Sequence, residues 1–367
     1  QHFKNFKDKF ENLGLVVKVL TGSTKSSERK TLLNDLKNGS INLLIGTHAI
    51  FEQNVIFNNL GYAVIDEQHR FGVKQRSKIW EKNNPPPHVL IMTATPIPRT
   101  LTMSLYGDLD LSIIDELPPG RKDVITVHRK DKNRLKVFGF IRDQIKQGRQ
   151  IYIVYPLIEE SKKMDLKYLE DGLESITREF DKENYSIGVM HGRMRSSNKD
   201  IEMNNFLNGK IDILISTTVI EVGVNVPNAS VMIIENAERF GLSQLHQLRG
   251  RVGRGKYDSY CVLMTNDKIS EDAKIRIDAM VNSNDGFKIS EVDLRLRGPG
   301  DVLGTKQSGV LDFKIADIIE DESILFSVSN EADLLIKKDP KLNLNENYNI
   351  RSFILNNPIN KSWNEIG

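Results

Sequence analysis

The chain has 367 residues, of which 39% are hydrophobic and 27% charged, and this composition is typical of a globular protein with two domains. The 51 Lys and Arg residues and 49 Asp and Glu residues leave a net charge of +2, so any nucleic-acid contact must come from local basic patches. The single cysteine, Cys261, excludes a disulfide framework and a multi-cysteine zinc site and suits a reducing cytosol. No apolar run approaches the roughly 20 residues of a membrane-spanning helix, so we expect no membrane association.

Short apolar runs alternate with longer amphipathic stretches, which predicts a parallel-sheet α/β fold. The predicted strands are mostly apolar throughout, as expected where both faces are covered: 15–20, 41–45, 63–65, 89–92, 124–128, 151–154, 187–190, 211–215, 231–234 and 259–264. The helical patterns between them are 26–38, 133–147, 168–180 and 198–207, with Ser197 as a predicted N-cap and Asn-Gly helix ends at 38–39 and 208–209. Because the chain opens at Gln1 inside a helical pattern, we expect a further N-terminal portion.

Proline, glycine and charge concentrate in DELPPGRK, residues 115–122, which predicts a linker between two similar α/β blocks. The two blocks show no repeat in their sequences. A helical stretch at 271–283 leads into a Gly-rich segment at 295–309, and the last forty residues are typical of one helix and a weakly structured tail. These features predict four parts, residues 1–118, 119–268, 269–325 and 326–367.

The clearest chemical signal is Asp66-Glu67, two adjacent carboxylates directly after the predicted strand 63–65. Open α/β sheets bind ligands at the carboxyl ends of their strands. In nucleoside triphosphate hydrolysis one carboxylate there can hold Mg²⁺ and the other can orient the attacking water; a solvated acidic turn is the alternative. Thr93 and Thr95 follow the next strand and can hydrogen-bond this acidic end, although they also suit an ordinary turn before proline.

Three arginines are interleaved with glycines in QLRGRVGRG, residues 247–255. Guanidinium groups bind phosphate oxygens bidentately and keep their charge, so this segment suits a phosphate site, with a surface basic cluster as the alternative. Residues 216–225 offer hydroxyls and backbone amides after another predicted strand. They suit either a nucleic-acid phosphate or a simple helix cap.

In their order along the chain these signals resemble motifs II, III, V and VI of superfamily 2 helicases. Longer strings resemble the RecG family of bacterial branched-DNA helicases, namely IDEQHRFGVKQR (65–76), MTATPIPRTL (92–101), IDELPPGR (114–121), TTVIEVGVNVPNAS (217–230) and LHQLRGRVGRG (245–255). The segment DLRLRGPGDVLGTKQSG, residues 293–309, resembles the translocation motif that RecG shares with the transcription-repair coupling translocase, in its RecG form Gly-Pro-Gly-Asp. The resemblance extends to about residue 335.

This resemblance implies two RecA-like parallel-sheet domains, the first truncated, followed by a helical translocation module. It implies ATP and Mg²⁺ as cofactors, bound between the two domains, in a monomeric cytoplasmic enzyme. The implied activity is translocation on double-stranded DNA that remodels stalled forks and Holliday junctions in recombination and repair. The implied partners are branched or double-stranded DNA, with single-strand-binding protein as a further candidate.

The resemblance also assigns roles to individual residues. Asp66 would hold Mg²⁺ and Glu67 the attacking water, while Arg251 and Arg254 would act as arginine fingers assisted by Gln247. The residues that would couple the nucleotide to DNA are His69, Thr93, Thr95 and Gln307. Those that would contact nucleic acid are Gly22, Thr47, His48, Arg193, Thr217 and Arg297.

Two departures from the family pattern matter. The P-loop string Gly-x-x-x-x-Gly-Lys-[Ser/Thr] does not occur in the 367 residues, so we expect this chain alone to bind ATP weakly and to hydrolyse it negligibly. Appreciable DNA-dependent ATP hydrolysis by the purified chain would refute that expectation. In motif V, Asn225 stands where the family has Asp and lacks its charge.

Two alternative functions stay open at this point. A fragment of the transcription-repair coupling translocase would share the motor motifs, but the Gly-Pro-Gly-Asp string argues against it. A passive duplex-DNA-binding module would use the same surfaces without turnover, and only a motor would change its DNA affinity when an ATP analogue binds. A P-loop metabolic kinase is excluded, because it would leave the arginine motif and the translocation segment unexplained.

Overall fold

The computed structural model describes residues 2–67, 78–97, 110–156, 162–181, 183–217, 226–297 and 320–356. The chain divides into two compact units. The first contains the described residues of 1–95, 99–111 and 305–367, and the second those of 96–98 and 112–304. Residues 112–118, assigned to the first domain from sequence, thus belong to the second unit, and the four-part division otherwise stays a prediction.

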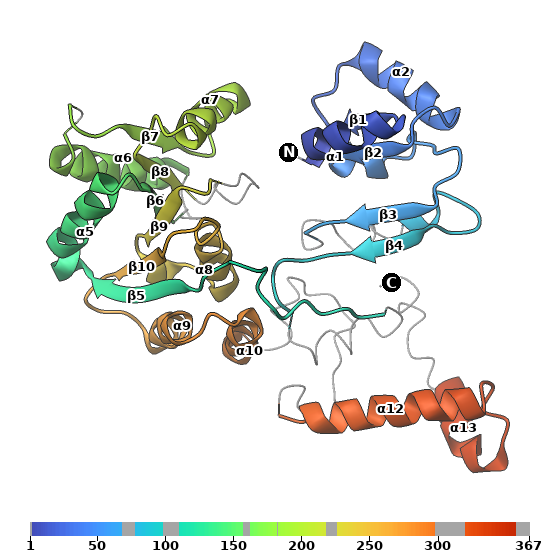
Figure 1. Ribbon diagram of the computed structural model, residues 1–367. Coiled ribbons are helices and arrows are strands. Elements are labelled where there is room, and N and C mark those ends of the chain that lie inside the picture. Colours follow the sequence, from blue (N-terminus) through green and yellow to red (C-terminus); the bar gives the residue numbers. More distant parts are fainter. Residues whose placement is uncertain are drawn as a thin grey trace. The chain divides into compact units, whose positions relative to one another are not determined.

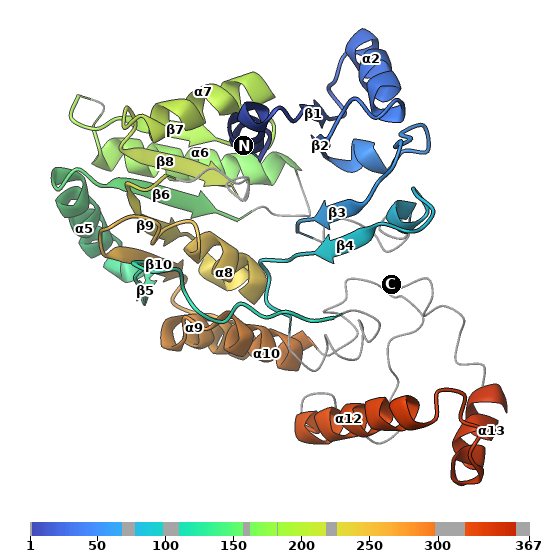
Figure 2. The same cartoon turned by 45° about the vertical axis from the view of Figure 1, so that its right-hand side comes forward.

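The second unit is built on six strands, β5 (Val124–Lys130), β6 (Gln150–Tyr155), β7 (Ile187–Met190), β8 (Ile213–Thr217), β9 (Ala229–Ile234) and β10 (Ser259–Thr265). Their order in the sheet is β5-β10-β9-β6-β8-β7, and every pairing is parallel (Figures 1 and 2). All carboxyl ends therefore lie at one edge of the sheet, as the apolar strand pattern predicts.

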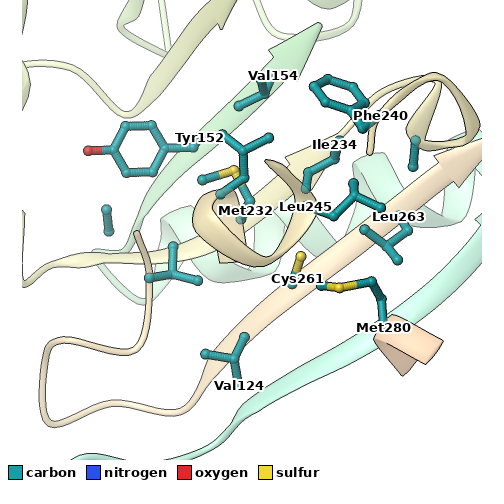
Figure 3. Close-up of a cluster of buried hydrophobic side chains, with 14 of the residues drawn as sticks. Val124, Tyr152, Val154, Met232, Ile234, Phe240, Leu245, Cys261, Leu263 and Met280 are labelled. Atoms are coloured by element: carbon teal, nitrogen blue, oxygen red, sulfur yellow. The ribbon is translucent and has the colours of Figure 1, made fainter. Parts of the chain in front are cut away.

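Helices cover both faces of this sheet, namely α5 (Arg134–Lys146), α6 (Lys162–Glu179), α7 (Ser196–Leu207), α8 (Leu242–Arg249), α9 (Glu271–Asn282) and α10 (Gly286–Arg297). Successive strand residues point to opposite faces, so Tyr152 and Val154 join one buried cluster while Ile151 and Ile153 join the other. Figure 3 shows the first cluster, in which Tyr152 and Val154 lie with Leu245 of α8. The second cluster is closed by α5 and α6.

The first unit contains two separate pairs of parallel strands, β1 (Val17–Leu20) with β2 (Leu43–Gly46) and β3 (Tyr62–Ile65) with β4 (His88–Ile91). Its helices in this part are α1 (His2–Phe10) and α2 (Ser26–Lys37). One small buried cluster lies under α2, formed by Leu20, Leu32, Leu36, Ala49 and Val55. All ten predicted strands are thus confirmed, each to within two residues.

Several local predictions need correction. Residues 320–356 contain two helices, α12 (Glu322–Lys338) and α13 (Tyr348–Asn356), where the sequence predicts one helix and a tail. Asp339 accepts hydrogen bonds from the backbone of Asn343 and Leu344 and from the Asn347 amide, so the polar stretch forms a turn between helices. Ser197 is not an N-cap, because α7 begins at Ser196 and its N-cap is Arg195.

Short 3₁₀ helices lie at Glu11–Leu13, His48–Phe51, Asp131–Asn133, Ala237–Arg239 and Asn345–Asn347. Among the described residues, no helix combines the length and the apolar character that crossing a bilayer requires.

Candidate functional site

The predicted acidic pair and the predicted threonines lie at the same edge of the β3–β4 pair. Asp66 and Glu67 follow β3 directly, and Thr93 and Thr95 follow β4. The two strand ends are level, because the backbone N–H of Met92 donates to the carbonyl of the last residue of β3 at 2.8 Å. The threonine hydroxyls lie 2.7 Å apart, and the Thr95 N–H donates to the Thr93 hydroxyl at 3.2 Å. The structure therefore brings these four residues together as predicted.

Glu67 has a strained backbone, with a φ of 53° in the left-handed region. Residues with a side chain rarely adopt this conformation, which costs about 1–3 kcal/mol and is concentrated at functional sites. The Glu67 N–H donates to Asp66 Oδ1 at 2.9 Å, while His2 Nε2 lies 3.7 Å from Asp66 Oδ2. The Asp66 side chain remains 50% exposed, so its oxygens are open to a ligand.

The donor set at this edge fits Mg²⁺ rather than a metal enclosed by protein. No group of three or more His, Cys, Asp or Glu side chains could hold a metal among the residues that the structure describes. Magnesium usually binds one or two carboxylates together with phosphate oxygens of a substrate and water. Asp66 and Glu67 match that requirement.

A β-loop-α-β segment occurs once in each unit at an offset of 170 residues. Helix α2 begins at residue 26 and α7 at residue 196, and each follows an extended cationic residue, Lys25 (φ −60°, ψ 144°) or Arg195 (φ −61°, ψ 144°). The strand entries match as well, since Val16 N–H donates to Asn42 Oδ1 at 2.9 Å and Ser186 N–H to Asp212 Oδ2 at 2.8 Å. The two sequences also agree at this offset, with Ser-Ser and Asn-Gly at the two helix ends, Gly22 matching Gly192 and Thr47 matching Thr217, a repeat that the sequence analysis missed.

This repeat places the predicted nucleic-acid residues at equivalent positions. Thr47 directly follows β2, and Thr217, 170 residues later, ends β8. In the first unit, Gly22 and His48 lie at the same strand edge as Thr47, and in the second unit Arg193 lies at the edge of Thr217. These predicted contacts are therefore brought together within each unit.

The Thr217 hydroxyl is buried and lacks a partner among the described residues. Thr217 is 2% exposed, and its Oγ1 has no hydrogen-bond partner among the described residues. Because buried polar atoms are nearly always paired, an unpartnered hydroxyl at a strand end suits an acceptor or donor on a bound molecule.

The arginine motif divides into two roles. Arg251 and Arg254 lie in the loop after α8, four and seven residues beyond Gln247, and Arg254 Nε donates to the carbonyl of Gly250 at 3.0 Å. Partial burial and the charges of Arg251 and Arg121 lower the pKa of Arg254. Arg251 and Arg254 therefore form a cationic loop. The charge of Arg121 also acts on this loop, and the sequence analysis gave Arg121 no role.

Arg249 corrects the prediction that all three motif arginines face phosphate. It is 3% exposed, and its Nη1 donates to Met280 O at 2.9 Å, Ser283 O at 2.7 Å and Thr126 Oγ1 at 3.3 Å. A buried guanidinium must satisfy its donors internally, so this arginine ties α8 to β5 and to the end of α9.

Arg297 ties α10 to α8. Its Nε donates to Asp293 Oδ1 at 3.0 Å, and Asp293 also accepts from the Ser243 hydroxyl at 3.2 Å. The guanidinium lies against Gly241, where a Cβ would meet it at 2.4 Å. The Arg297 side chain is still 44% exposed, and its contact with nucleic acid stays a prediction. His69, Asn225 and Gln307 lie outside the described residues.

Three family models match successive parts of the chain. Residues 1–104 match the family model of the DEAD/DEAH box helicase, and residues 133–256 that of the helicase conserved C-terminal domain. Residues 283–357 match the model described as ATP-dependent DNA helicase RecG, domain 3, C-terminal.

Curated relatives with the same description show high identity. The chain is 51% identical to ATP-dependent DNA helicase RecG of Synechocystis sp. over 351 residues, covering 96% of this chain and 42% of the relative. The Bacillus subtilis relative is 48% identical over 339 residues, which cover 92% of this chain and 49% of the relative. The relative of Escherichia coli strain K12 is 47% identical over 345 residues, which cover 93% of this chain and 50% of the relative. The chain thus spans about half the length of the curated relatives it matches.

Solved structures agree with this result. A structure of RecG bound to a three-way DNA junction matches with a TM-score of 0.67 and 43% identity, covering 89% of this chain and 41% of that chain. The Mycobacterium smegmatis helicase Lhr, bound to single-stranded DNA and AMP-PNP, matches with a TM-score of 0.54 at 16% identity, covering 77% of this chain and 39% of that one. The second match shows the fold alone.

Proposed function

The chain belongs to the RecG family of ATP-dependent DNA helicases, and we propose that it is the motor portion of an enzyme that hydrolyses ATP to move along double-stranded DNA. The observation that carries the proposal is the β-loop-α-β segment that recurs at an offset of 170 residues. A translocating motor needs two sites that bind the DNA backbone, and this repeat offers one such site, at an equivalent strand edge, in each unit. Phosphate contacts position a protein without reading sequence, which suits a motor that passes over any bases.

The residues proposed for ATP hydrolysis follow the family pattern. ATP with Mg²⁺ supplies the phosphoanhydride bond whose cleavage drives movement. Asp66 binds the metal, and Glu67 orients a water and takes its proton. Arg251 and Arg254 neutralise negative charge on phosphate oxygens, and Gln247 assists them from α8.

The DNA and coupling residues complete the proposal. Phosphates are held by Gly22, Thr47, His48, Arg193, Thr217 and Arg297. The nucleotide state is transmitted by His69, Thr93, Thr95 and Gln307. The contact of α10 with α8 through Asp293 supports this coupling, because it ties the RecG-specific segment to the helix of the arginine motif.

We extend the substrate to branched DNA, because a RecG relative was solved on a three-way junction. Forks and Holliday junctions are the corresponding cellular substrates, and recombination and repair the processes. The enzyme acts as a cytoplasmic monomer, with single-strand-binding protein as a further partner.

The test uses the complete protein, wild type and Glu67→Gln, in ATPase assays with no DNA, linear duplex and a three-way junction. Duplex DNA should stimulate wild-type hydrolysis, and the junction should stimulate it more. Glu67→Gln should lose at least about 100-fold in kcat while junction affinity stays within about twofold, because the carboxylate acts on water and not on DNA. DNA-independent hydrolysis, or full activity of Glu67→Gln, would contradict the proposal.

A further inference from the structure

A third arginine lies beside the cationic loop that follows α8. The Arg121 N–H donates to the Pro118 carbonyl at 3.1 Å, and Gly120 has a φ of 80°. Proline at the second position, here Pro119, and a positive-φ glycine at the third are the features of a type II turn. Because proline fixes one backbone angle and the hydrogen bond closes the turn, the linker presents Arg121 in a restricted position.

This turn leads into a segment that packs on the arginine loop. A Cβ on Gly253, which lies between the two proposed arginine fingers, would meet the Val124 side chain at 2.8 Å and the Lys122 carbonyl at 3.6 Å. Glycine at this position therefore lets the loop approach the residues that follow Arg121. In both views the chain leading into β5 runs next to α8 (Figures 1 and 2).

The charge of Arg121 acts on two side chains of this region. With partial burial and the charge of Arg251, it lowers the pKa of Arg254. With burial and the charge of Arg249, it lowers the pKa of His246 to about 4. In the part of the chain that the structure describes, no carboxylate lies within ion-pair distance of Arg121 or Arg254. Two like charges, those of Arg121 and Arg254, that lack such a counter-charge among the described residues suit a site for an anion.

We propose that Arg121 supplies the third guanidinium of the phosphate site formed by Arg251 and Arg254, and that it binds an oxygen of the nucleotide's phosphate chain. The inference rests on the proposed function, which brings ATP to these arginines. The phosphate chain of ATP carries several negative charges, whereas each DNA phosphate carries one, so three arginines in one region favour the nucleotide. The planar fork of arginine matches phosphate oxygens in a way that lysine does not.

The kinetic test compares Arg121→Ala, Arg121→Lys and the control Lys122→Ala in the complete protein. The control side chain is exposed, and its charge is paired with Asp258 at 2.7 Å. With saturating duplex DNA, Arg121→Ala should lower kcat/KM for ATP about 10- to 100-fold while the DNA concentration for half-saturation stays within about twofold. Arg121→Lys should restore part of the loss, and Lys122→Ala should match the wild type.

An unchanged kcat/KM in Arg121→Ala would overturn the inference. A change confined to the DNA half-saturation would also overturn it, because the arginine would then bind a DNA phosphate. Melting curves followed by circular dichroism establish that each variant is folded.

A wild-type enzyme without DNA-stimulated hydrolysis would instead refute the proposed function. The inference is then decided by calorimetric titration of residues 1–367 with inorganic pyrophosphate. Binding that Arg121→Ala weakens at least about fivefold supports it, whereas equal binding by the two chains, or none by the wild type, overturns it.

Discussion

The two units use strands of similar sequence but bury them to different degrees. Strand β6, QIYIVY, is buried at every position, whereas Tyr62 and Val64 of β3, YAVI, are 58% and 51% exposed. The difference lies in what surrounds them: β6 has a neighbour on each side and helices on both faces, while β3 pairs only with β4 among the described residues. An apolar run therefore predicts that a strand forms, and tertiary structure decides whether it is covered.

The largest effect expected of this difference comes from a matched pair of helix residues. Phe206 of α7 and Leu36 of α2 occupy equivalent positions in the repeat, and both are buried. Phe206 packs on Tyr152 with ring centroids 4.8 Å apart, inside a large cluster that we expect to close little over the space a truncation leaves. Phe206→Ala should cost about 4 kcal/mol and Leu36→Ala about 2, because the smaller cluster can collapse. Hydrogen exchange of the α7 and α2 amides measures both, and equal losses would contradict the comparison.

The next effect tests the buried arginine of the second unit. Arg249→Met keeps the apolar stem but leaves the carbonyls of Met280 and Ser283 without their donor, at a cost of about 3 kcal/mol. Exchange protection should fall first in α9 and β5, which this side chain ties to α8. A uniform loss of exchange protection over the whole sheet would show that Arg249 does not act locally where α8 meets its neighbours.

A pH effect of about 2–3 kcal/mol follows from His246. Burial and the charge of Arg249 lower the pKa of His246 to about 4 in the folded chain. The unfolded chain therefore binds the proton more readily, and stability falls as the pH drops from about 6.5 to about 4. Urea unfolding at several pH values should show this loss, and His246→Gln should remove most of it. An identical pH profile for the variant would rule out the assignment.

The smallest effect is expected on the uncovered strand. Val64→Ala should change the unfolding free energy of residues 1–367 by less than about 0.5 kcal/mol, since the side chain is half exposed already. The control Ile153→Ala, at a fully covered strand position, should cost about 3 kcal/mol. Similar costs for the two variants would mean that β3 is covered in solution.

Sequence patterns predicted the strands and the polar residues at their ends, because apolar runs and the residues that end them are local properties of the sequence. They missed α10, which begins at Gly286 directly after the polar residues 282–285 and packs on α8, although its own Lys, Glu, Leu and Arg residues are good helix formers. They also could not separate Arg249 from Arg251, since both lie in one Gly-rich string and only burial distinguishes them. Arg121 was missed for a similar reason, because its neighbours in space are distant in sequence.

The central claim is that the arginine loop after α8 acts on the phosphates of ATP during DNA-stimulated hydrolysis. The most direct measurement is kcat for ATP in the complete protein with saturating duplex DNA, for wild type, Arg251→Ala and the exposed control Arg129→Ala. The account predicts a loss of at least about 1,000-fold for Arg251→Ala and wild-type turnover for the control. Arg251→Ala turning over ATP at the wild-type rate would contradict it.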